Sequence, residues 1–147
     1  MEKRKLGKTG IEVSEIAFGT VSLGLPYGIG MKNHEDMLPE AEAVKLLQTA
    51  LDNGINFYDT ARSYGCSEEI IGKAFKGKQD DVVISTKSNH FLDENGQVYS
   101  KNKLKETVNE SLEKSLSVLG MDYIDLYMSH TGTEEVINNH DVLYLMA

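Results

Sequence analysis

Short apolar runs rich in branched residues alternate along the chain with longer stretches in which apolar residues recur at helical spacing. The first pattern is typical of buried parallel strands, and the second of helices that pack against them. The sequence predicts strands at Ile16–Phe18, Ile55–Tyr58, Val82–Ser85 and Tyr123–Met128. Parallel strands need crossover connections, so the alternation predicts an α/β fold.

Helix signals follow the predicted strands. The sequence predicts helices at about Pro39–Asn53, Ser67–Phe75, Ser100–Gly120 and from Thr133 through Ile137. Ser67 and Ser100 are expected N-caps, because a hydroxyl oxygen there accepts from free backbone N–H groups. Glu68 falls in a first helical turn, where the helix dipole favours negative charge. Gly120 is expected to end the longest helix, since glycine readily adopts the left-handed conformation of a helix C-terminus.

Three segments lie outside this alternation. Lys5-Leu6 and Ile11–Val13 flank Gly7–Gly10, a loop of hairpin length, and predict a small N-terminal hairpin. The stretch from Gly19 to Asp36 has no helical period and predicts a long, mobile loop. Asn138–Asp141 is unfavourable for a helix, so the helical pattern is expected to fade there.

Composition indicates one globular unit. The chain has 147 residues, of which 40% are hydrophobic and 26% charged, a size and balance typical of a single soluble domain. No linker or low-complexity segment divides it, so residues 1–147 are interpreted as one unit. Lys plus Arg is 15 and Asp plus Glu is 23, which gives a net charge of -8. That sign argues against a nucleic-acid partner.

The sequence also argues against a membrane, secretory or metal-binding protein. No apolar run reaches the length of a membrane helix, and the opening residues lack the apolar stretch of a secretory signal. A cytoplasmic location is therefore expected. Cys66 is the only cysteine, and no CxxC or HExxH spacing occurs, so no disulfide and no metal are expected.

Candidate chemistry lies where the predicted strands end. Gly19, Asp59, Lys87 and His130 each follow or close a different strand. Ligands of parallel α/β folds bind at the carboxyl ends of the strands, so three ionisable side chains would project into one crevice. A hairpin followed by four strand–helix units is half of a closed (β/α)8 TIM barrel, which typically takes about 250 residues.

At these positions the sequence resembles the aldo-keto reductase family. The matching segments are Lys5–Gly10 with Val13-Ser14, Phe18–Thr20, Asn56–Ala61 with Tyr64-Gly65 and Ser67-Glu68, Ser85–Lys87, and Asp122–Tyr127 up to His130. They cover nearly the whole chain in the family's order. The most specific is Asp-Thr-Ala-x-x-Tyr-Gly-x-Ser-Glu, which begins at Asp59.

The resemblance implies a catalytic tetrad of Asp59, Tyr64, Lys87 and His130 that reduces a small carbonyl substrate. Tyr64 would donate the proton, the Lys87 ammonium would favour the phenolate, and Asp59 would hold the lysine. His130, in its neutral form, would orient the substrate oxygen.

The resemblance also implies a nicotinamide cofactor. NADP(H) is expected, with NAD(H) not excluded. Gly19, Thr20 and Asp59 would lie beside the nicotinamide ribose.

Simpler interpretations exist for each residue alone. Tyr64 could be an amphipathic residue at the rim of the sheet, and Asp59 with Lys87 could form a structural ion pair. Four such residues in the family's order favour the catalytic interpretation. His34, His90 and His140 match no motif and are interpreted as surface residues. Gly24, Gly28 and Gly30 lack the spacing of a dinucleotide fingerprint and are interpreted as part of a substrate-side loop.

The family has eight strands and this chain supplies four, which leaves two functions open. The chain could be part of a reductase, either truncated or completed by pairing with a second half. It could instead be a catalytically inactive half-barrel fragment that self-associates. An open half-barrel leaves its first and fourth strands unpaired, so a homodimer through the open barrel edges is a natural arrangement.

Overall fold

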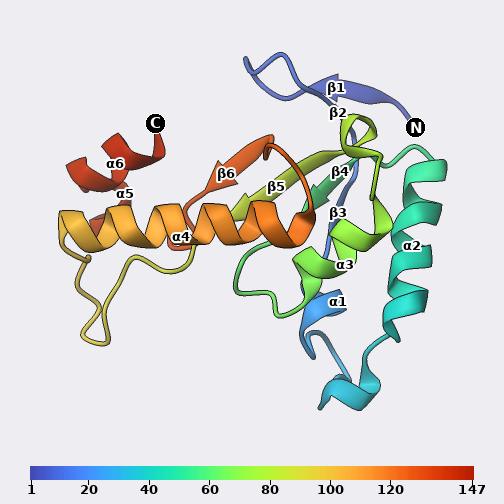
Figure 1. Cartoon of the computed structure of the whole chain (residues 1–147), viewed down its shortest axis with the longest axis horizontal. Coiled ribbons are helices and arrows are strands. Elements are labelled where there is room, and N and C mark those ends of the chain that lie inside the picture. The colour runs from blue at the N-terminus through green and yellow to red at the C-terminus, as the bar shows by residue number, and fades with distance from the viewer.

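The computed structural model describes residues 1–147, and its chain begins with the expected hairpin. β1 (Lys3–Lys5) pairs antiparallel with β2 (Glu12–Ser14). Gly7 and Gly10 have φ of 54° and 81°, a left-handed conformation that side chains disfavour, so glycine suits both ends of the turn. The hairpin extends beyond one end of the main sheet (Figure 1).

The main sheet has four parallel strands, as the alternation predicts. They are β3 (Ala17–Gly19), β4 (Phe57–Asp59), β5 (Val83–Lys87) and β6 (Leu126–Met128), in the spatial order β3-β4-β5-β6. Each strand thus lies beside the next one in the sequence, which is the arrangement of successive units around a barrel.

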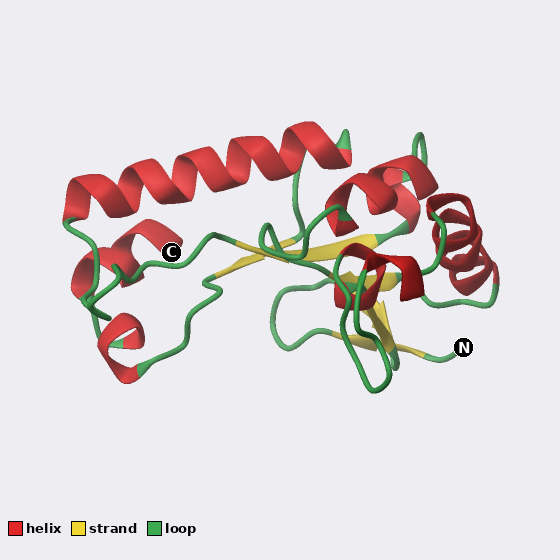
Figure 2. Ribbon diagram, turned by 90° about the horizontal axis from the view of Figure 1, so that it is seen from below, coloured by secondary structure: helices red, strands yellow, loops and turns green.

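Three helices of eight or more residues cover one face of this sheet. They are α2 (Glu40–Asp52), α3 (Ser67–Ala74) and α4 (Lys101–Leu119). Figure 2 shows α4, the longest, running along one side of the sheet. Gly120 ends α4 with φ of 64°, so this predicted helix end is confirmed. None of the helices is long and apolar enough to span a lipid bilayer.

Two segments that the sequence predicts to be non-helical, residues 19–36 and 138–141, contain helical structure, so these two predictions are wrong. The segment expected to be a long loop contains α1 (Val21–Gly24) and a 3-10 turn at His34–Asp36. The chain also forms α5 (Glu134–Ile137) and α6 (His140–Met146). The amide oxygen of Asn139 accepts from the backbone N–H groups of residues 141 and 142, at 3.0 and 3.1 Å, and this cap offsets the poor helix propensity.

The predicted serine caps are not formed. The N-cap of α3 is Cys66, and Ser67 is the first helical residue. The buried Ser67 hydroxyl lies 3.0 Å from that of Thr60 and donates to the hydroxyl of Thr20 at 2.6 Å. Ser100 occupies the N-cap position of α4, but its side chain makes no capping hydrogen bond.

The main hydrophobic core lies between the sheet and the helices. Tyr58 and Ile84 point outward from β4 and β5, with 0% and 1% of their surface exposed. The Tyr58 ring lies 4.6 Å from that of Phe75. A smaller cluster joins α4 to the C-terminal helices through Phe91, Leu104, Val108, Val136 and Val142.

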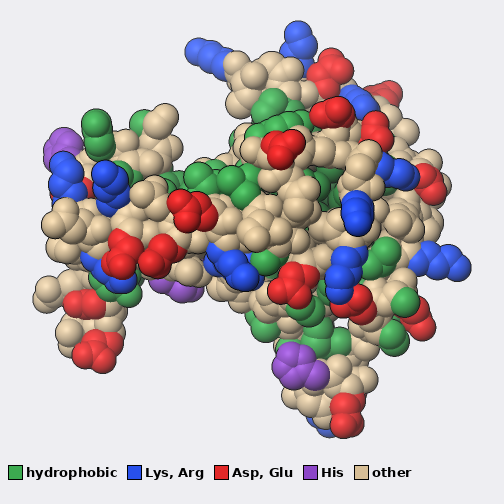
Figure 3. Space-filling view, viewed as in Figure 1, with side chains coloured by type: hydrophobic (Ala, Val, Ile, Leu, Met, Phe, Trp, Pro, Cys, Tyr) green, Lys and Arg blue, Asp and Glu red, His purple; other side chains and the backbone are tan.

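The opposite, inner face of the sheet carries no helices. β3 is therefore not the buried strand that its sequence predicts: Ala17 and Gly19 are exposed and Phe18 is half-buried. An open, mostly apolar hollow on this face is lined by side chains from the four strands and by the hairpin loop Leu6–Thr9. In the view of Figure 3, hydrophobic side chains show between the hairpin and α4, and charges of both signs are interspersed around them.

Asn56 attaches the hairpin to the sheet. Its amide oxygen accepts from the backbone N–H of Ser14 at 2.7 Å, and its amide nitrogen donates to the carbonyl of Glu12 at 3.0 Å. Its own backbone N–H donates to the Ser14 hydroxyl at 3.2 Å. These three bonds hold β2 beside the start of β4, and so place the hairpin at the amino-terminal end of the barrel strands.

Candidate active site

The predicted catalytic side chains meet at the carboxyl ends of the strands. Asp59 is the last residue of β4 and Lys87 the last of β5, rather than a residue just beyond it. His130 follows β6, and Tyr64 lies in the loop between β4 and α3. Parallel pairing brings these ends together, so residues up to 71 positions apart in sequence share one site.

Lys87 and Asp59 form a closely matched ion pair. The Lys87 ammonium donates to both carboxylate oxygens, at 2.8 and 2.9 Å, and to the carbonyl of Thr60 at 2.8 Å. Its three protons thus have three acceptors within the protein. The hydroxyl of Ser85 also donates to Asp59, at 3.3 Å. The position and orientation of the ammonium are fixed before any ligand binds.

Tyr64 lies between the ammonium and the imidazole. Lys87 Nζ is 5.1 Å from the centre of the Tyr64 ring. The ring of His130 meets it edge to face, with centroids 5.8 Å apart and planes at 84°. A phenol, an ammonium and an imidazole therefore converge on one space.

The surroundings of His130 favour its neutral form. Partial burial lowers the pKa of His130 below the usual 6.5, and the neighbouring His90 and Lys87 lower it further, while Asp59 opposes them. Its Nδ1 lies 3.2 Å from the Ser63 hydroxyl.

His90 is exposed, as predicted from the sequence, which interprets it as a surface residue. The sequence does not predict that His90 also lies next to His130. Its ring is 4.5 Å from that of His130, and its Nδ1 lies 2.9 Å from the Thr131 hydroxyl. The loops after β5 and β6 thus bring two imidazoles together.

The segment proposed for the cofactor lies at the end of β3. A side chain at Gly19 would meet no atom within 4 Å, so the space beside its backbone is open. Thr20 is fully buried, and its backbone N–H and hydroxyl both donate to the carbonyl of Asp59, at 3.0 and 2.9 Å. The Thr20 side chain therefore holds the backbone of Asp59 in place and does not face the site.

A buried polar network anchors the loop that carries Tyr64. Glu68, at 1% exposure, forms an ion pair with Arg62 of that loop. It also accepts from the hydroxyls of Thr86 on β5 and Ser115 on α4, at 2.7 and 2.8 Å. From the sequence alone, Glu68 is expected only to lie in a favourable first helical turn. The small polar residues on the buried face of α4 are the signal that could have revealed a buried partner.

Two glycines bring α1 close to the same loop. A side chain at Gly24 would begin 1.8 Å from the carbonyl oxygen of Tyr64, and one at Gly65 would begin 2.0 Å from the carbonyl oxygen of Gly24. No other residue fits at either position without moving the backbone beside Tyr64. Gly24 thus helps to position the candidate proton donor, whereas its sequence context predicts only a place in a substrate-side loop.

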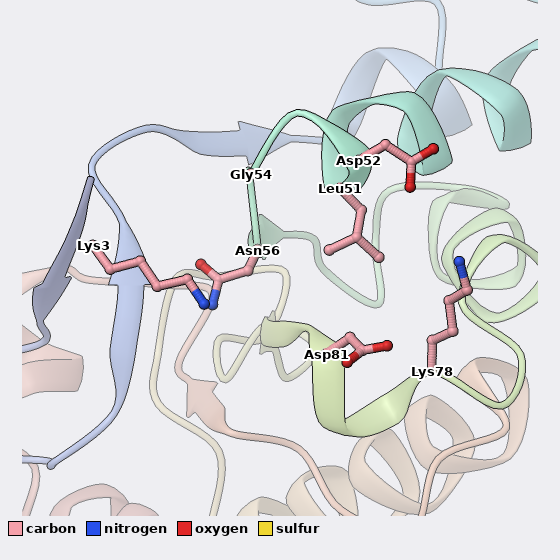
Figure 4. Close-up of a pocket in the computed structure, with 7 residues that line it drawn as sticks. All are labelled: Lys3, Leu51, Asp52, Gly54, Asn56, Lys78 and Asp81. Carbon is pink, nitrogen blue, oxygen red and sulfur yellow. The ribbon is translucent and has the colours of Figure 1, made fainter. Parts of the chain in front are cut away.

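A second, polar hollow lies at the opposite end of the strands (Figure 4). Asn56 and Asp81, which precede β4 and β5, line it together with Lys3 and Lys78. In barrels of this kind the amino-terminal end serves stability, while the carboxyl end carries the chemistry. The predicted tetrad lies at the carboxyl end, which is therefore our candidate active site.

A model of the aldo/keto reductase family matches residues 15–136, and the chain belongs to this family. The resemblance seen in the motifs is thereby confirmed, and the four strand–helix units correspond to half of the family's (β/α)8 barrel.

Three relatives illustrate the match. The chain is 36% identical over 137 residues to the uncharacterized oxidoreductase YqkF of Bacillus subtilis, covering 92% of this chain and 40% of that protein. It is 33% identical over 141 residues to the NADH-specific methylglyoxal reductase of Escherichia coli, and the match covers 88% of this chain and 42% of that protein. The solved holo form of an aldo-keto reductase from Bacillus halodurans is 36% identical and superimposes with a TM-score of 0.69. This match covers 90% of this chain and 41% of that chain. The chain thus spans about two fifths of the length of each.

Proposed function

We propose that this chain supplies the catalytic groups for NADP(H)-dependent reduction of an aldehyde or ketone to an alcohol, with Tyr64 as the proton donor. The observation that carries the proposal is the Lys87 ammonium, which is bound by both oxygens of Asp59 and lies 5.1 Å from the Tyr64 ring centre. A structural ion pair alone does not require a phenol and a neutral imidazole at the same place.

The residue types suit the reaction. When bound, the reduced nicotinamide supplies hydride to the carbonyl carbon. The carbonyl π electrons then move to the oxygen, which takes the Tyr64 proton, and the Lys87 ammonium stabilises the phenolate left behind. Asp59 keeps the lysine charged and oriented. His130, as a neutral imidazole, donates a hydrogen bond to the substrate oxygen and positions it.

Gly19, Thr20 and Asp59 are the residues that would hold the nicotinamide ribose. The open space beside Gly19 supports this assignment, because a ribose needs close approach to the backbone. Thr20 contributes by fixing Asp59. NADP(H) stays our prediction and NAD(H) the alternative, since the Escherichia coli relative is named for NADH. A small carbonyl substrate and a cytoplasmic location also stay predictions.

The test joins residues 1–136 to the remaining part of the Bacillus subtilis relative, so that the barrel is complete. In this chimera, Tyr64→Phe should lower turnover of a small aldehyde by about 10²- to 10⁴-fold, the usual contribution of general acid catalysis, while NADPH and NADH affinities stay nearly constant. Tyr123→Phe, at an exposed tyrosine, is the matched control. Near-normal turnover of the Tyr64 variant would remove it from the mechanism.

A second candidate function is favoured by the open inner face. Ile16 precedes β3 and Met128 ends β6, and these residues are 57% and 40% exposed at the two unpaired edges of the sheet. We propose that the isolated chain covers this face by forming a homodimer, which would bind cofactor weakly and be catalytically inactive.

Sedimentation tests this second candidate. Met128→Lys should weaken the dimer about tenfold or more, because it places a charge in the proposed interface. Leu46→Lys, on α2 and also 40% exposed, should leave association unchanged. A monomeric chain that oxidises NADPH with an aldehyde at ordinary enzymatic rates would overturn the proposal.

A further inference from the structure

The ring of His130 makes a single hydrogen bond in this structure. Its Nδ1 lies 3.2 Å from the hydroxyl oxygen of Ser63, and no protein group is bonded to Nε2. The Ser63 hydroxyl likewise has no other hydrogen-bond partner in the protein. Ser63 directly precedes Tyr64, so the loop that carries the candidate proton donor also contacts the imidazole.

The proton state of His130 makes this contact informative. Partial burial, His90 and Lys87 lower the pKa of His130, so a neutral ring with one N–H is favoured. Two tautomers are then possible, with the proton on Nδ1 or on Nε2. They differ in which nitrogen can donate a hydrogen bond to a ligand.

Hydrogen-bond satisfaction favours one of them. With an unprotonated Nδ1, the Ser63 hydroxyl donates its proton to the ring, and one group, the Nε2–H that points away from Ser63, is left without a protein partner. With a proton on Nδ1, Ser63 accepts instead, and two groups, its own hydroxyl proton and the unprotonated Nε2, are left without a protein partner. Polar groups in partly buried positions usually find partners, which favours the first arrangement.

The neighbours of His130 restrict its ring plane as well. The Tyr64 ring meets it edge to face at 84°, and the His90 ring packs against it at 59°. The hydrogen bond between His90 and Thr131, at 2.9 Å, fixes His90 in turn. Neither neighbouring ring bonds to a nitrogen of His130, so the choice of tautomer falls to Ser63.

We propose that Ser63 is a positioning residue, whose hydroxyl donates to Nδ1 of His130 and thereby holds the imidazole as the Nε2–H tautomer. Only this tautomer presents an N–H away from Ser63, where it can donate to a substrate oxygen. The use of that N–H in carbonyl reduction rests on the proposed function, whereas the tautomer is a property of the ligand-free chain.

Long-range proton–nitrogen NMR spectra of the isotope-labelled chain test the assignment directly, at a pH of about 8, where histidine is neutral. The chain has 4 histidines, and His34 and His140 serve as internal references. His130→Asn identifies the signals of the ring in question. We expect the nitrogen chemical shift of its Nε2 to be that of a protonated ring nitrogen, and the shift of its Nδ1 to be that of an unprotonated one.

Three variants separate the positioning role from a general structural one. In Ser63→Ala the two nitrogen shifts of His130 should move toward each other, because the two tautomers then interconvert without selection. Ser63→Thr keeps a hydroxyl and should restore the separation. Ser129→Ala removes a nearby hydroxyl that bonds a backbone carbonyl at 2.7 Å, and should change neither shift.

Two results would overturn the proposal. One is a proton on Nδ1 of His130 in the unsubstituted chain, and the other is an unchanged pair of shifts in Ser63→Ala. Neither depends on cofactor or turnover. A failure of the proposed reduction would appear instead in the Tyr64→Phe assay, with the tautomer of His130 unaffected.

Discussion

The two faces of the same four strands have different surroundings. Outward-pointing Tyr58 and Ile84 are completely buried beneath helices, whereas Ala17 and Met128 on the inner face are exposed. Asp59 and Lys87 belong to the inner face, because they are in register with its residues. The outer face thus supplies stability, and the inner face carries the candidate catalytic groups together with a hollow that no helix covers.

The largest expected effect concerns the buried network on the outer side. Glu68→Ala should lower the free energy of unfolding by about 3–5 kcal/mol, because it leaves the Arg62 guanidinium without its buried partner. Urea denaturation measures the loss. Glu69→Ala, at the exposed neighbour, should cost far less. Equal losses in the two variants would show that the network does not stabilise the fold.

The next prediction compares the faces directly. Ile84→Ala should cost about 2–5 kcal/mol, the usual range for a large aliphatic side chain in a packed core. Leu126→Ala, on the half-buried inner face, should cost clearly less because water already reaches the site. Urea denaturation of both variants at several protein concentrations measures the difference. A loss in Leu126→Ala as large as that in Ile84→Ala, and dependent on concentration, would show that association buries the inner face.

The smallest expected effect is on the pH dependence of the free energy of unfolding, through His130 at the carboxyl end of the inner face. Burial lowers the pKa of His130 in the folded chain below its usual 6.5, so the unfolded chain binds the proton first as pH falls. The neutral His130 therefore contributes stability at pH values above 6.5, the usual histidine pKa. This contribution is lost as the pH falls from 6.5 through the lowered pKa of the folded chain. His130→Gln should flatten this part of the stability profile, measured by urea denaturation between about pH 8 and pH 5. An unchanged slope would contradict the assignment.

The sequence predicts the parts of the fold that depend on local signals. Gly120 marks the end of α4, and glycines bound the hairpin turn, because each position has a backbone conformation that glycine favours. The four strands are recognisable as apolar runs. The order of Asp59, Tyr64, Lys87 and His130 carries the resemblance from which the candidate site is predicted.

The remaining features depend on contacts between distant segments. Burial of β3 cannot be predicted from its own residues, because it depends on what covers the inner face. The hydroxyl of Ser67 is drawn from capping into contact with Thr20, which lies 47 positions away in sequence. The contact between the rings of His90 and His130 depends on how two loops meet, and neither loop contains a pattern that specifies the other.

The strand register makes the site sensitive to changes in strand length. Asp59 pairs with Ser85, and Lys87 lies two residues further along β5 on the same face. Deleting a single residue within β5 ahead of Lys87 would move the lysine to the place of Thr86, beside Glu68 on the outer side. Insertions and deletions should therefore be tolerated in a surface turn such as residues 93–96, but not within the strands, where one residue decides whether an ammonium faces the phenol or the core.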